Sequence, residues 1–180
     1  MNILGISGSI RTGSYNKAIL LKAKELLPEN VEMAIHDLNQ LPLYDDTLAA
    51  ENPPESVLAF RQAITQADGL LIASPEYNYS MTGVLKNALD WAATNTMSNI
   101  LSDKTVAIMG ASRTMFGSVR AQLHLRQVLH AVNAKVIRKP EVFISRAQDH
   151  ITDDSIITDE KIISRIKDLV NTLIQEISGS

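Results

Sequence analysis

The strongest constraint on the fold is a regular alternation, along the whole chain, between short apolar runs and stretches with helical periodicity. Five apolar runs are predicted to be strands, at residues 2–7, 31–37, 70–74, 105–110 and 135–137, with an extension near residues 142–144. Helical patterns occupy residues 15–27, 54–67, 84–91, 119–132 and 161–177. Strand–helix units in series are typical of an α/β fold in which helices cover both faces of a parallel sheet.

The pattern within the strands refines this prediction. Several strands are apolar at consecutive positions, as expected for strands that are buried on both faces. Val31, Met33 and Ile35 alternate with polar or small residues, which predicts an edge strand. With 180 residues, the chain fits one domain on a prior of roughly 100–200 residues each. The longest irregular segment, residues 38–53, is expected to be a functional loop.

Composition excludes several classes of protein. The chain has no cysteine, which rules out disulfide scaffolds, thiol redox chemistry and iron–sulfur clusters. The net charge of −3 shows no excess of basic residues for binding nucleic acid. No run approaches the ~20 apolar residues that span a bilayer, and no N-terminal leader pattern is present. We therefore expect a cytoplasmic protein without nucleic-acid or membrane partners.

The loop after the first strand has the composition of a phosphate site. In open parallel sheets, ligands bind beyond the carboxyl ends of the strands. Residues 8–16 read GSIRTGSYN and lead directly into a helix. Glycines allow backbone N–H groups to converge, hydroxyl groups can donate to oxygens, and Arg11 can add a two-pronged cationic contact. Neither of the nucleotide-binding motifs G-x-G-x-x-G and Gly-Lys-Ser/Thr is present. The alternative is an ordinary polar turn with a helix cap, because loops rich in serine and glycine are common.

The loop after the third strand suits a planar ring. Residues 74–80 read SPEYNYS and again precede a helix. Backbone N–H groups and the Asn78 amide can hydrogen-bond the edge of a ring system, and Tyr77 can pack beside it. The alternative is that the tyrosines only hold the loop in place.

Taken together, GSIRTGSYN and SPEYNYS resemble the NAD(P)H-dependent FMN reductase family, whose members include small quinone, azo-dye and chromate reductases. LKNA at residues 85–88, LPLY at 41–44 and LRQVL at 125–129 are also similar to that family. The resemblance covers residues 3–142. It implies a flavodoxin-like three-layer sandwich whose five-stranded parallel sheet has the order 2-1-3-4-5, with FMN as a non-covalent cofactor.

The resemblance also implies which residues bind FMN. Five would hold the phosphate: Ser9, Arg11, Ser14, Tyr15 and Asn16. Four would line the isoalloxazine ring: Pro75, Glu76, Tyr77 and Asn78. Residues 110–112, with Ser112 as a polar group, would close the other edge of the ring. No catalytic side chain and no metal are expected, because the chemistry belongs to the cofactor.

One segment departs from the family pattern. Many relatives have a glycine-rich stretch after the fourth strand, whereas residues 112–117 read SRTMFG. We expect these bulkier residues to shape the binding of the nicotinamide nucleotide and the acceptor. Arg113 is the candidate contact for a nucleotide phosphate; the alternative is a surface arginine paired with a nearby acid.

The activity implied by the resemblance is a hydride transfer from NADPH or NADH to flavin N5, followed by reduction of a quinone-like, azo, metal-oxyanion or free-flavin acceptor. A homodimer, or a tetramer built from it, is the expected assembly, with Tyr44 and Trp91 as candidate interface residues. Trp91 is otherwise expected in the core.

Two alternatives are kept. One is a flavodoxin-type electron carrier without its own reductase activity, which the modest negative charge disfavours. The other is a hydrolase in which Ser7, in a near match to the nucleophile elbow, would use His150 as its base. The remaining histidines do not have metal-ligand spacing.

Overall fold

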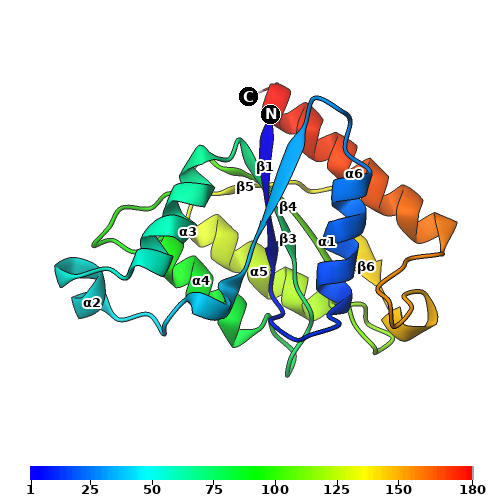
Figure 1. Ribbon diagram of the computed structural model, residues 1–180, viewed down its shortest axis with the longest axis horizontal. Coiled ribbons are helices and arrows are strands. Elements are labelled where there is room, and N and C mark those ends of the chain that lie inside the picture. Colours follow the sequence, from blue (N-terminus) through cyan, green and yellow to red (C-terminus); the bar gives the residue numbers. More distant parts are fainter. Residues whose placement is uncertain (180) are drawn as a thin grey trace.

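The computed structural model describes residues 1–179 and is built on one parallel β-sheet (Figure 1). The strands lie in the order β2-β1-β3-β4-β5, with β6 paired to β4. Their bounds are β1 Asn2–Ser7, β2 Glu32–His36, β3 Gly69–Ala73, β4 Thr105–Ala111, β5 Lys135–Val136 and β6 Val142–Ile144. The predicted flavodoxin-like order is confirmed, and so is the edge position of the alternating strand β2.

Helices cover both faces of the sheet. Their bounds are α1 Tyr15–Glu25, α2 Asp46–Glu51, α3 Glu55–Gln66, α4 Gly83–Ala92, α5 Val119–Ala131 and α6 Glu160–Ser178. Two 3₁₀ turns, η1 Leu38–Gln40 and η2 Ala147–Asp149, complete the elements. Figure 1 shows α1 and α6 on one side of the sheet, with α3, α4 and α5 on the other.

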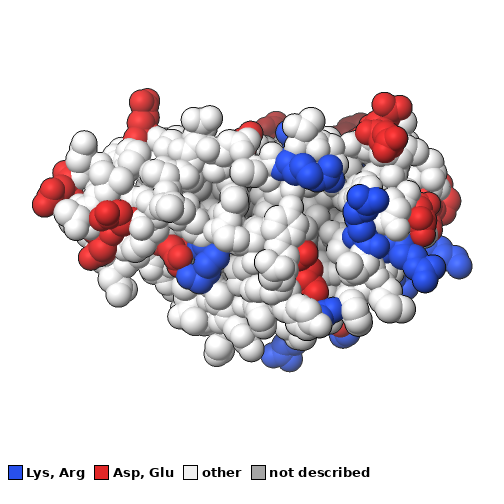
Figure 2. All heavy atoms as spheres, turned by 90° about the horizontal axis from the view of Figure 1, so that it is seen from below, with Lys and Arg blue, Asp and Glu red and all other residues white. Residues whose placement is uncertain are grey.

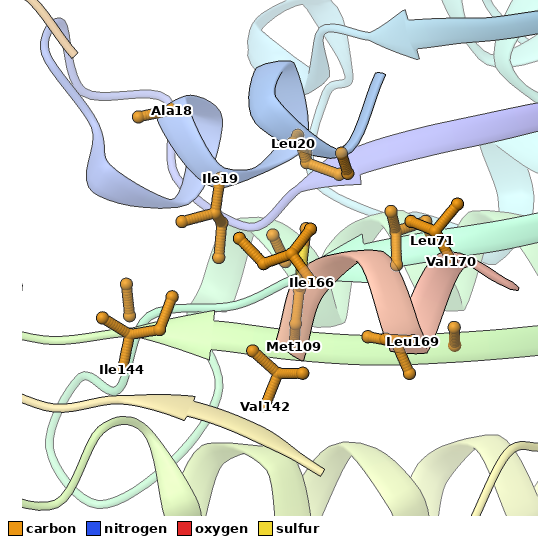
Figure 3. Packing of buried hydrophobic residues seen from close by; sticks show 14 of the residues in the cluster. Ala18, Ile19, Leu20, Leu71, Met109, Val142, Ile144, Ile166, Leu169 and Val170 are labelled. Carbon is orange, nitrogen blue, oxygen red and sulfur yellow. The ribbon is translucent and has the colours of Figure 1, made fainter. Parts of the chain in front are cut away.

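Each face of the sheet has its own apolar core. On the α1 and α6 side, Ile19 and Ile166 pack against Leu71 and Met109 of the sheet (Figure 3). On the other side, residues of α3, α4 and α5 pack against β1, β3 and β4. The central strands β3 and β4 are buried at every position. This burial on both faces explains why their sequences are continuously apolar rather than alternating.

The fifth position of the sheet is shared by two short strands. Residues 105 and 106 of β4 pair with β5, whereas residues 109–111 pair with β6. The predicted extension near residues 142–144 is therefore a separate strand. It pairs with the carboxyl end of β4 and so contributes to the edge of the sheet that carries the candidate site.

Residues 38–53 are less irregular than predicted, because they contain η1 and α2. Asp45 caps α2 by accepting hydrogen bonds from the N–H groups of Thr47 and Leu48, at 2.8 and 3.1 Å. Ala49 packs with Val57 and Trp91 in a small cluster.

Within residues 1–179, no helix is both long enough and apolar enough to span a membrane.

Candidate functional site

The site lies at the carboxyl ends of the strands, where the loops after β1, β3 and β4 meet. Figure 2 shows this face: most of it is uncharged, and acidic side chains lie mainly toward its two ends. The loops are joined by direct contacts. The side-chain amide of Asn16 donates to the carbonyl of Ala111 and accepts from the N–H of the same residue, both at 3.0 Å. This buried pair holds the start of α1 against the end of β4.

The loops after β1 and β3 are joined in the same way. The hydroxyl of Thr82 donates to the carbonyl of Gly8 at 2.6 Å and also caps α4 by accepting from the N–H of Leu85 at 3.2 Å. The loop after β3 approaches the carboxyl end of β4 closely at Gly110, where a Cβ atom would lie 2.4 Å from the Ser74 carbonyl oxygen. Only glycine fits there.

The loop after β1 presents backbone donors that the protein does not use. Within the described chain, the N–H groups of residues 10–14 donate to no protein acceptor. They lead into the start of α1, where Ser14 caps the helix by accepting from the N–H of Lys17 at 3.4 Å. Free N–H groups at a helix start form a site for an anion. The backbone thus has unused donors in the loop for which the glycines and hydroxyls predict a phosphate site.

Arg11 is exposed at this loop and is held by local contacts. Its guanidinium donates to the carbonyls of Thr12 and Gly13, at 3.2 and 2.7 Å, and lies 5.6 Å from the centre of the Tyr15 ring. Both carbonyls belong to the loop itself. The cation is therefore kept beside the free N–H groups, although no acidic side chain neutralises it within residues 1–179.

The loop after β3 contains a tight turn with unusual backbone angles. Tyr77 and Ser80 exchange two backbone hydrogen bonds, of 2.9 and 3.0 Å. Asn78 and Tyr79 between them have φ values of 47° and 69°. Both lie in the left-handed region, which disfavours a residue as large as tyrosine. The turn leaves the side chains of Tyr77 and Asn78 exposed at the rim of the site.

Arg120 of α5 holds this turn in place. Its Nε lies 3.0 Å from Oε1 of Glu76, and its backbone N–H donates to Oε2 of the same carboxylate at 3.0 Å. The guanidinium carbon also lies 3.8 Å from the centre of the Tyr79 ring and 4.1 Å from that of Phe116. These contacts offset the strain of the turn and join the loop after β3 to the loop after β4. We call these four residues the Arg120 clamp.

The loop after β4 is braced from the other side. The N–H of Ser112 donates to the carbonyl of Ile144 at 3.0 Å, and the Ser112 hydroxyl lies 3.0 Å from that of Thr114. Arg113 is exposed, and within residues 1–179 it forms no ion pair. The alternative in which Arg113 is paired with a nearby acid is therefore not supported.

The ten predicted site residues all lie on these three loops or at the start of α1, but in two different roles. Those with side chains at the rim are Ser9, Arg11, Tyr77 and Asn78. Tyr15 is half-buried beneath Arg11. Those engaged in internal contacts or enclosed are Ser14, Asn16, Pro75, Glu76 and Ser112. The Asn16 and Glu76 side chains also hold the loops in position, and their predicted contacts with FMN remain a prediction.

Sequence reasoning missed Arg120 and Thr82. Thr82 carried a usable signal, because a threonine directly before a predicted helix is a common cap. Arg120 carried none, since its partner Glu76 lies 44 residues away. The structure does not support the hydrolase alternative, because within residues 1–179 no hydrogen bond joins Ser7 to His150. The Ser7 hydroxyl donates to the carbonyl of Ser9 at 3.1 Å, and His150 pairs with Asp159 at 2.9 Å.

The candidate interface residues differ in their exposure. Trp91 is fully buried within one chain, and its indole N–H donates to the carbonyl of Pro42 at 2.8 Å. The expectation that Trp91 lies in the core is confirmed, and its full burial within one chain contradicts the alternative of an interface contact. Tyr44 is half-buried against Trp91, with ring centres 5.0 Å apart. Its hydroxyl donates to Asp46, and hydrogen bonds from Thr96 and Tyr44 lower the pKa of that carboxyl.

Comparison with known proteins places this geometry in context. The family model for NADPH-dependent FMN reductase matches residues 1–149. An NAD(P)H-dependent FMN reductase of Pseudomonas aeruginosa is 44% identical over 173 residues, which cover 96% of this chain and 93% of that protein. An NAD(P)H:quinone oxidoreductase of Solanum tuberosum is 38% identical, covering 93% and 88%.

Solved structures show a similar likeness to NAD(P)H-dependent flavoenzymes. The flavoenzyme NAD(P)H:(acceptor) oxidoreductase FerB of Paracoccus denitrificans superposes with a TM-score of 0.90 at 30% identity, covering 99% of this chain and 97% of that one. A flavodoxin from the domain Archaea shares the fold, with a TM-score of 0.66, but is only 12% identical. Likeness in sequence therefore favours the reductases over the electron carrier.

Proposed function

The chain belongs to the NADPH-dependent FMN reductase family, and from this premise we propose that it uses FMN to oxidise NADPH or NADH and to reduce a small-molecule acceptor of the quinone type. The observation that carries the proposal is the meeting of three loops at one edge of the sheet, with free backbone donors beside Arg11. Curated relatives named as FMN reductases and quinone reductases support the same chemistry.

The residues of the loop after β1 fit the phosphate of FMN. Five consecutive N–H groups, residues 10–14, have no protein acceptor within the described chain. The positive end of the α1 dipole adds to their attraction for an anion. Arg11 can exchange its two carbonyl contacts for the stronger, charge-assisted bonds that a phosphate offers. We infer that Ser9 and Arg11 bind the phosphate, while Ser14 and Asn16 maintain the shape of the loop.

The residues of the loop after β3 fit the edge of the isoalloxazine ring. The backbone N–H groups of Glu76 and Asn78 donate to no protein acceptor within the described residues. The turn also exposes the amide of Asn78 and the ring of Tyr77. Donors near the pyrimidine end of a flavin favour negative charge on the reduced ring. We infer that these groups orient the ring and that the Arg120 clamp holds them.

FMN, when bound, supplies the ability to accept a hydride and to pass electrons to an acceptor. The protein orients the reactants and keeps the cofactor in place, because reacting atoms must be held roughly 3–3.5 Å apart. We assign no side chain as an acid or base. Nδ1 of His124 lies 3.0 Å from the Ser80 hydroxyl in an exposed contact, to which we assign no catalytic role.

The experiment that tests the function is a reduction without oxygen. Purified protein loaded with FMN is mixed with NADPH or NADH, and the flavin absorbance band is followed. We expect the band to disappear and then to return when a benzoquinone is added. A band that stays unchanged with both nucleotides would support the electron-carrier alternative. The absence of FMN binding would overturn the proposal.

We also propose that the protein forms a homodimer, or a tetramer built from it, and that it acts in the cytoplasm, where reduced nicotinamide nucleotides are available. Exposed apolar side chains beside the site support self-association, since Tyr79, Met115 and Phe116 are each at least half exposed. Light scattering at micromolar concentration tests the assembly, and a mass of one chain would contradict it. Cell fractionation tests the location.

A further inference from the structure

A groove of about 500 Å³ lies beside the phosphate loop, on the side away from the loops after β3 and β4. Its walls are α1, the loop after β1 and the carboxyl end of β2. Residues 74–80 and 110–117, which would surround the flavin ring, do not contribute to its lining. Its volume is within the range of roughly 300–1,000 Å³ for sites that bind small molecules.

One face of α1 gives this groove its chemical character. Lys17, Leu21 and Lys24 follow each other at helical spacing, so they lie on the same side of the helix. All three line the groove. Leu21 is 42% exposed although it is a large apolar residue, and Ile10, 50% exposed, lies on the loop opposite. Together with Ile35 these side chains form an apolar floor between two ammonium groups.

The charges of the groove are not balanced within the chain. Three basic side chains, Arg11, Lys17 and Lys24, line it, with Asp37 as the one carboxylate. None of the three basic groups forms an ion pair within residues 1–179, whereas Lys22, on another face of α1, pairs with Glu25. Burial lowers the pKa of His36, outweighing the opposite effect of Asp37, so this ring stays uncharged at neutral pH. The groove is therefore basic in a protein whose net charge is −3.

We propose that this groove binds an organic phosphate, namely a phosphate ester on a nucleoside, with the ammonium groups of Lys17 and Lys24 on the phosphate and the base against Leu21 and Ile35. A phosphate explains the unpaired cations, and a flat base explains the exposed apolar floor. A simple inorganic anion would leave that floor uncovered. Two ligands have this chemistry. One is the adenosine 2′-phosphate end of NADPH, and a role for it rests on the proposed function. The other is a separate mononucleotide, and a role for it does not depend on that function.

The test measures binding to protein loaded with FMN, so that the phosphate loop is already filled. Calorimetric titrations at low salt use 2′,5′-ADP, AMP and adenosine. We expect the two phosphate esters to bind and adenosine to bind at least tenfold more weakly. In the variant with Lys17→Gln and Lys24→Gln together, their affinity should fall about tenfold or more. The matched control Lys22→Gln removes a lysine from another face of α1 and should change nothing.

Competition identifies the source. If 2′,5′-ADP competes with NADPH and the double variant raises the KM for NADPH but not for NADH, the ligand is the adenosine 2′-phosphate of the cosubstrate. If AMP binds without competing, the ligand is a separate nucleotide. Failure of both esters to bind at millimolar concentration, or equal binding by wild type and double variant, overturns the proposal. The flavin spectrum of the same sample shows independently whether FMN is bound, so failure of the proposed function is seen separately.

Discussion

The loops after β1 and β3 lie at the same edge of the sheet, but they are built in different ways. The loop after β1 leaves five N–H groups free, and Arg11 contacts only near neighbours in the chain, namely two carbonyls of its loop and the Tyr15 ring. The loop after β3 is held by partners far along the chain: Glu76 and Tyr79 contact Arg120, and Ser80 contacts His124. One loop presents its donors through local geometry, and the other depends on tertiary contacts.

This difference separates two kinds of functional residue. We expect that removing a side chain at the rim of the loop after β1 weakens ligand binding but leaves stability unchanged, because the backbone of that loop keeps its shape. A residue that supports the second loop acts through that loop, so its removal changes the position of groups that it never touches. Asn16 and Thr82 link the two loops to the rest of the site and belong to the second kind.

The largest effect is expected for Asn16→Ala. This substitution leaves the buried N–H and carbonyl of Ala111 without partners, at a cost of about 1–3 kcal/mol for each group in the free energy of unfolding. Urea unfolding of the apoprotein measures this loss, and FMN affinity should fall with it. The exposed Asn30→Ala is the matched control and should stay near wild type. Unchanged stability of Asn16→Ala would contradict the bridging role.

Arg11→Ala should weaken FMN binding without changing stability, because Arg11 is exposed and contacts only two carbonyls of its loop and the neighbouring Tyr15 ring. Loss of a charge-assisted hydrogen bond corresponds to about 1.5–3 kcal/mol, or roughly a tenfold to hundredfold rise in Kd. Titration of apoprotein with FMN measures it. Arg11→Lys keeps the charge but loses the two-pronged geometry, so it should fall between. An unchanged Kd would remove Arg11 from the site.

Arg120→Ala should loosen the loop after β3 while leaving the loop after β1 as it is. We expect about tenfold weaker FMN binding, on the scale of one lost bond to a charged group. Amide hydrogen exchange should accelerate at Tyr77 and Ser80, whose N–H groups are hydrogen-bonded within the turn, but not at the hydrogen-bonded N–H of Gly8 in the loop after β1. Arg120→Lys keeps a cation near Glu76 but not the planar stack on Tyr79, so it should rescue only part of the effect. Equal acceleration in both loops would mean that they are not independent.

The smallest effect is expected for Arg113→Ala, which should raise the KM for the reduced nicotinamide nucleotide and leave FMN affinity nearly unchanged. An exposed charge contributes about 0.2–1 kcal/mol, or up to roughly a fivefold change in KM. Steady-state kinetics with NADPH and NADH measure it. If both KM values stay at wild type while Lys17→Gln with Lys24→Gln raises the KM for NADPH, the nucleotide phosphate binds on the β2 side.

The sequence by itself determined the order of strands and helices and the place of the site. Continuous apolar runs predict strands buried on both faces, and the alternation in residues 31–35 predicts the edge strand. Both follow from the sequence because buried positions require apolar side chains and exposed positions tolerate polar ones. The loop after β1 was also readable, since its function depends on glycines, hydroxyls and a helix start that are neighbours in the chain. The resemblance to the reductase family rests on these same local motifs.

Only the tertiary structure decided which polar side chains stay free at the rim of the candidate site and which hold its loops together. Asn16 and Glu76 stand within the predicted motifs, yet their partners Ala111 and Arg120 lie 95 and 44 residues away. Helix α2, with six residues, is too short to be stable by propensity and depends on the packing of Ala49. The groove beside α1 arises in the same way, because the carboxyl end of β2 and the Lys17–Leu21–Lys24 face come together only when the sheet forms. Contacts between distant segments have no local pattern, and so the physical reason for each appears only once the chain has folded.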